Sequence, residues 1–123
     1  MGCDPNDNRL NFLNLSRHSV IAEISNDSST FNFNNVSYYK RKVVLSNSIL
    51  VFPRMGSSHA MVDYVDHGMN KMLYLVVFSV DTINKYSDKM SMDLLFKQKK
   101  YSKLLACSKK ELLSQNWMIS YKK

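Results

Sequence analysis

Apolar and polar residues alternate along the first part of the chain, a pattern typical of strands with one buried face. Residues 19–25 have an apolar side chain at every second position, and a polar turn follows at residues 26–29. Phenylalanines then alternate with asparagines over residues 31–34. Because asparagine tolerates positive φ angles, Asn34 and Asn35 suit a two-residue hairpin turn.

Two further strands are expected after this turn. Residues 36–45 form the return strand of the predicted hairpin, and a second polar turn follows at residues 46–48. Residues 49–52 are a short apolar run that ends at Pro53, a residue that cannot donate a hydrogen bond to a sheet. The N-terminal half is therefore predicted to be an antiparallel β-meander.

A short helix is predicted over residues 57–67, with Ser57 or Ser58 as its N-cap. Gly68 stands where the chain would leave this helix in a left-handed conformation. Residues 72–80 are then almost continuously apolar, which is typical of a strand covered on both faces. A buried helical segment is the alternative interpretation.

Two C-terminal helices complete the expected fold, over residues 90–107 and 109–120. On a helical wheel the first has leucines on one side and lysines on the other. The second begins with Ser108 and Glu111, which have the spacing of a capping box. The predicted class is α+β, with residues 10–123 as a single domain and residues 1–9 as a flexible arm. The length of 123 residues and the apolar content of 45% are those of an ordinary globular domain.

The net positive charge is concentrated at the C-terminal end. Residues 97–123 hold eight lysines and one acidic residue, which gives 8 − 1 = +7, the formal charge of the whole chain. Such asymmetry indicates an anionic partner. The alternative is that these lysines solvate the outer side of a core helix.

We accordingly expect a small accessory protein, not an enzyme, that binds RNA or another polyanion with little sequence specificity. Lysine is a point charge suited to phosphates more than to base edges. Aromatic side chains beside the lysines are expected to stack on unpaired bases. The expected interface comprises Lys97, Lys99, Lys100, Lys103, Lys109, Lys110, Phe96 and Tyr101, with Lys122 and Lys123 adding charge.

A second hypothesis is a peripheral membrane protein of matrix type that self-associates through a sheet edge. Gly2 and Cys3 resemble an acylation signal, and the lysines would add attraction to anionic lipid. Asn6 departs from the myristoylation pattern, which requires Ser or Thr at that position.

A third hypothesis is a metal-dependent enzyme using His59, Asp63 and His67, which recur every four residues on the predicted short helix. The geometry is unfavourable, because the three residues span about 12 Å of helix. The chain has three glycines and no glycine-rich phosphate loop, and we expect no cofactor.

The two cysteines, at positions 3 and 107, form no disulfide framework, which is typical of a reducing compartment. The N-terminus lacks the pattern of a secretion signal, and the longest apolar run is too short to span a bilayer. We therefore expect an intracellular protein of the cytoplasm or nucleus. Abundant Asn, Lys and Tyr with few Gly and Pro suggest an AT-rich genome, such as that of a virus.

Overall fold

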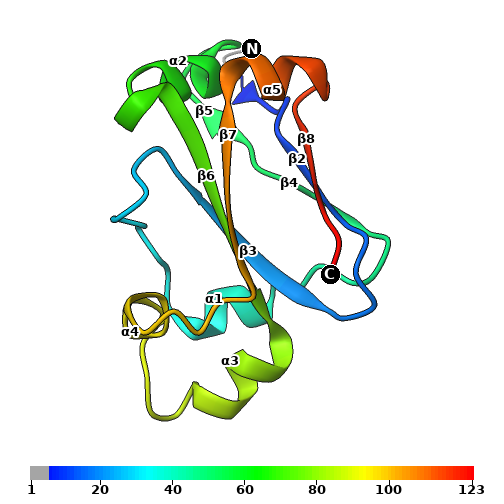
Figure 1. The fold of residues 1–123 in the computed structure, drawn as a ribbon, viewed down its shortest axis with the longest axis vertical. Coiled ribbons are helices and arrows are strands. Elements are labelled where there is room, and N and C mark those ends of the chain that lie inside the picture. Colours follow the sequence, from blue (N-terminus) through cyan, green and yellow to red (C-terminus); the bar gives the residue numbers. More distant parts are fainter. Residues whose placement is uncertain (1–5) are drawn as a thin grey trace, which may run out of the picture.

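Short strands and helices alternate along the chain in a mixed α+β fold, the predicted class. The computed structural model describes residues 6–123 (Figure 1). The strands are β1 (Asn6–Asp7), β2 (Asn11–Asn14), β3 (Val20–Ser25), β4 (Ile49–Val51), β5 (Arg54–Met55), β6 (Met72–Ser79), β7 (Lys103–Ser108) and β8 (Met118–Tyr121). The helices are α1 (Val36–Lys40), α2 (Ala60–Asp66), α3 (Val80–Tyr86), α4 (Met92–Lys97) and α5 (Lys109–Ser114), with a 3₁₀ turn, η1, at Met69–Lys71.

Most strands pair with strands distant in sequence. One antiparallel sheet has the order β3-β6-β7, a second has the order β4-β2-β8 with β2 and β8 parallel, and β1 pairs with β5. Val20 and Val44 exchange backbone hydrogen bonds, so the segment before β4 lies against the free edge of β3. The strands predicted at residues 19–25 and 49–52 are present, but they are not connected as a meander.

Strand β6 lies in the centre of the core, as its continuous apolar run predicts. Leu73, Leu75 and Val77 belong to one buried cluster, which also contains the inward side chains of the second sheet, α2 and α5. Tyr74, Val76 and Phe78 belong to a second cluster, with the apolar sides of α1, α3 and α4. Successive residues of a strand point to opposite faces, so both faces of β6 are covered. The helical alternative for this segment is wrong.

The predicted return strand over residues 36–45 is wrong, because its first part is helix α1. The Asn35 side chain accepts a hydrogen bond from Tyr38 N at 2.9 Å and caps this helix. Tyr39 is buried, and its hydroxyl donates to Glu23 Oε1 of β3 at 2.7 Å. An asparagine suits a hairpin turn and a helix N-cap alike, and here tertiary packing selects the cap.

The two long C-terminal helices are also wrong in extent. Helix α4 ends at Lys97, Lys99 has a φ of 56°, and residues 103–108 form β7. Backbone groups of β6 that do not bond β3 need partners, and β7 supplies them in antiparallel register. The capping box of Ser108 and Glu111 is present, but α5 is one turn and a half long and the chain then returns to the second sheet as β8.

Residues 6–9 are joined to the start of α2. Of the arm expected over residues 1–9, residues 1–5 lie outside the described residues, and residues 6–9 are packed into the fold. Asp7 Oδ2 accepts from Met61 N at 2.9 Å, so a distant carboxylate, not Ser57 or Ser58, caps α2. Gly68 has a φ of −85°, and it is needed for its close approach to Asn26, not for a left-handed exit.

Candidate polyanion-binding surface

Three helices that share one core cluster, together with the turns that follow them, carry most of the exposed positive charge. Figure 1 shows α1, α3 and α4 together at one end of the β3-β6-β7 sheet, with α2 and α5 at the other end. Residues 36–42 and 79–100 contain eight basic and three acidic residues, so 8 − 3 = +5. We call the eight exposed cations the basic helical layer: Lys40, Arg41, Lys42, Lys85, Lys89, Lys97, Lys99 and Lys100.

No cation of the basic helical layer is paired with a carboxylate in the described part of the chain. The two ion pairs among residues 6–123 lie elsewhere: Arg9 Nε is 2.7 Å from Asp7 Oδ1, and Lys109 Nζ is 3.1 Å from Asp66 Oδ2. The layer therefore presents net positive charge to solvent.

Lysines from two parts of the chain meet at Tyr86. The Lys85 and Lys100 ammonium groups each lie 5.3 Å from the centre of this half-buried ring. Cation–π attraction to the ring partly offsets the repulsion between two ammonium groups that share one site. The fold thus brings one lysine of α3 and one lysine of the segment after α4 to the same ring.

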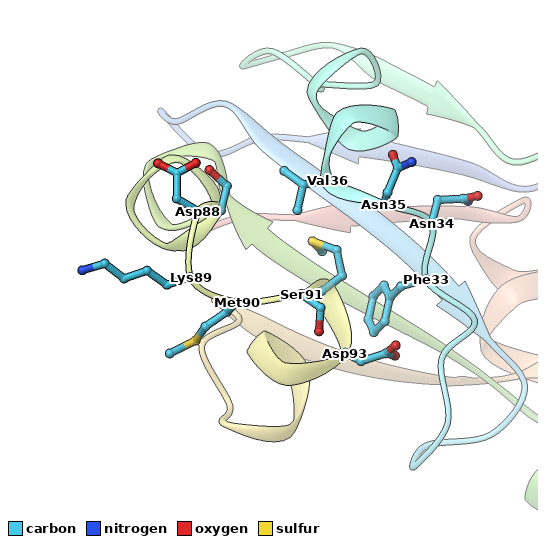
Figure 2. Close-up of a pocket in the computed structure, with 11 residues that line it drawn as sticks. Phe33, Asn34, Asn35, Val36, Asp88, Lys89, Met90, Ser91 and Asp93 are labelled. Carbon is cyan, nitrogen blue, oxygen red and sulfur yellow. The ribbon is translucent and has the colours of Figure 1, made fainter.

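A pocket of about 540 Å³ opens between α1 and the loop that joins α3 to α4. Figure 2 shows residues 33–36 on one side and the segment from Asp88 to Asp93 on the other, with the Lys89 side chain extending away from the pocket. Phe33 is half-buried, and its ring is held by neighbouring rings of Phe31, Phe78 and Phe96.

The polar groups at this pocket are largely unused by the protein itself. Asn35 Oδ1 caps α1, but the Asn35 amide nitrogen has no acceptor among residues 6–123. The side chains of Asn34, Asp88 and Asp93 likewise make no hydrogen bond within the described chain. The pocket thus has amide groups and two carboxylates at its exposed rim, and Phe33 and Val36 in its apolar part.

The lysines predicted as one interface are divided by the fold. Lys97, Lys99 and Lys100 belong to the basic helical layer. Lys103 is on β7 at the parity of Leu105 and Cys107, so it faces the other side of the sheet. Lys109 and Lys110 are on α5 at the opposite end of this sheet, and Lys122 and Lys123 are exposed at the C-terminus.

The aromatic residues predicted to stack on bases are instead part of the core. The Phe96 ring centre lies 4.9 Å from that of Phe31 and 5.6 Å from that of Tyr101, which also contacts Phe78. Both side chains are partly buried in the cluster beneath the helices. Sequence reasoning missed Lys85 and Lys89. The basic and acidic residues of positions 1–96 cancel in number, and a net charge of zero hides local clusters of lysines.

The residues of the metal hypothesis are not assembled into a site. Residues 6–123 contain no group of three or more side chains that could hold a metal ion, and His67 Nδ1 lies 2.7 Å from the Asp63 backbone oxygen. Both His59 and Asp63 are exposed on α2. Gly2 and Cys3 lie outside the described residues.

Two buried groups have raised pKa values. Burial and the hydrogen bond to Glu23 raise the pKa of Tyr39 far above its ordinary value, so its hydroxyl stays protonated. Burial, with the nearby charge of Glu111, raises the pKa of Cys107 and keeps this thiol un-ionised. Neither group adds negative charge to the molecule near neutral pH.

Comparison with known proteins gives no match, since no family model, no curated protein and no solved structure is significantly similar to this chain. No helix within residues 6–123 has both the length and the apolar character needed to cross a bilayer.

Proposed function

We propose that this protein is a binding protein for RNA or a similar polyanion, and that the basic helical layer is its interface. The carrying observation is eight exposed cations on three adjacent helices and the turns that follow them, with no carboxylate partner among the described residues. Lysine predominates there, so the contacts are mainly to phosphates and sequence preference is weak.

Binding of this kind depends steeply on salt, because every neutralised phosphate releases counterions. About five phosphate contacts to a single strand give a slope of about −3.5 in a plot of log affinity against log salt concentration. Between about 50 mM and about 200 mM salt the affinity falls by about two orders of magnitude.

The test compares two triple variants that change net charge equally, from +7 to +1. One reverses Lys85, Lys97 and Lys100 to Glu within the basic helical layer. The matched control reverses Lys110, Lys122 and Lys123 to Glu outside it. Affinity for a fluorescent single-stranded RNA is measured by anisotropy across a salt series, and folding is checked by circular dichroism.

The first variant is expected to lose at least about tenfold in affinity and to reduce the salt slope by about 2, since each lost contact removes about 0.7. The control is expected to retain most of the affinity and the slope. If both folded variants lost affinity equally, net charge and not the layer would explain binding, and the proposal would be wrong.

A further inference from the structure

We infer that the polyanion is a single-stranded nucleic acid, and that the pocket between α1 and the α3–α4 loop receives one unpaired base. This inference rests on the proposed function, because it concerns the same surface. It specifies a single-stranded nucleic acid, whereas positive charge alone would also attract a duplex, heparin or polyphosphate.

The pocket differs in charge from the helices around it. Its lining includes Asp88 and Asp93 against one cation, Lys89, whose side chain extends away. Phosphates are therefore repelled from the pocket while they are attracted to the lysines beside it. A neutral base connected to two phosphates matches this arrangement, because the base enters the pocket and its backbone stays on the charged surface.

The polar groups of the pocket fit the hydrogen-bonding edges of bases. A carboxylate accepts from the exocyclic amino group of cytosine, and an asparagine amide pairs with adenine. Within the described chain, no hydrogen bond is made by the side chains of Asn34, Asp88 and Asp93, and the Asn35 amide nitrogen has no acceptor. No protein group therefore competes with a base for these atoms. Uracil has no exocyclic amino group, so it leaves the carboxylates without a donor.

The base of the pocket also suits a flat ring. Phe33 is half-buried and fixed by aromatic neighbours, and the buried Met92 also lines the pocket. Unpaired bases characteristically stack on such side chains in single-strand recognition. A duplex keeps its bases stacked internally and cannot use this pocket without unpairing.

The experiment measures affinity for single-stranded oligo(A), oligo(C) and oligo(U), a duplex of the same length, and polyphosphate, at one salt concentration. The test variant combines Asp88→Asn with Asp93→Asn, which removes the carboxylate acceptors. The matched control combines Asp63→Asn with Asp81→Asn, which changes the net charge equally, on α2 and α3 and outside the pocket lining.

For the wild-type protein we expect oligo(A) and oligo(C) to bind at least about tenfold more tightly than oligo(U) and the duplex, as a good base contact allows. The double variant should reduce the preference for oligo(C) over oligo(U) to about twofold without weakening polyphosphate binding, and the control should retain that preference. Equal binding of all five probes would overturn the inference and leave the proposed function standing. Failure of every probe to bind would overturn both.

Discussion

The carboxylate of Asp7 holds the start of the chain, β1 and helix α2 together, so its removal is a sharp test of the fold. Asp7 is 3% exposed and accepts three hydrogen bonds: from Arg9 Nε at 2.7 Å, from Arg9 N at 3.2 Å and from Met61 N at 2.9 Å. The last of these caps α2, whose own N-cap residue, His59, makes no side-chain capping bond.

The cost of Asp7→Ala follows from these contacts. A lost helix cap costs about 1 kcal/mol, and loss of a charge-assisted bond to the partly exposed Arg9 adds about 2 kcal/mol. We therefore expect the free energy of unfolding to fall by about 3 kcal/mol, with a decrease in melting temperature of about 10 °C. The matched control is Asp63→Ala, an exposed residue in the first turn of the same helix, which should cost less than about 1 kcal/mol.

Urea unfolding followed by circular dichroism measures both variants, and acidification adds an independent check. Burial alone would raise the pKa of Asp7, but the hydrogen bonds from Arg9 and Met61 outweigh it and hold the pKa below its ordinary value of 3.8. Its stabilisation is therefore present above pH 3.8 and is lost as the pH falls through the lower folded value. The difference between wild type and Asp7→Ala should shrink in that acidic range. A loss below about 1 kcal/mol at neutral pH would refute the capping role.

Three further variants test other parts of the fold. Gly68→Ala should destabilise by about 2 kcal/mol in urea unfolding, because the new Cβ would lie 2.5 Å from Asn26 Cβ, and an unchanged midpoint would contradict this close approach. Tyr39→Phe should cost about 1–2 kcal/mol by the same measurement, since Glu23 and the Asn34 N–H lose a partner. Ser108→Ala should lower stability by about 1 kcal/mol in a thermal melt through loss of the capping box, and no decrease would show that α5 does not need it.

Elements whose sequence signal agrees with their surroundings could be predicted. The run from Met72 to Ser79 is apolar at nearly every position because both faces of β6 are buried, and length and branched residues favoured a strand. The capping box at Ser108 was predictable because it is a local interaction within four residues.

The errors occurred where one local pattern suits two structures. Asn35 suits a turn as well as a cap, and the interaction that decides, Tyr39 with Glu23, joins residues 16 positions apart. Residues 103–108 continue an amphipathic helical pattern, but the free edge of β6 pairs with them as a strand. Tertiary pairing of this kind is not visible in a sequence window.

The positive charge of the candidate site was predictable from the sequence, but the residues that form the site were not. A positive surface followed from the count of lysines, and three of the predicted lysines belong to the basic helical layer. The others were separated when β7 replaced the C-terminal end of an expected helix. Lys40 and Arg41 joined the layer because residues 36–40 are helical, which no charge count could show.

The most direct test of the account is where a polyanion contacts the protein. In a titration of isotope-labelled protein with single-stranded RNA at low salt, we expect amide chemical-shift changes in α1, α3 and α4, with little change in α2 and α5. Changes concentrated on α2 and α5, or no changes at RNA concentrations that saturate a lysine-rich control peptide, would contradict the claim that the basic helical layer is a binding surface.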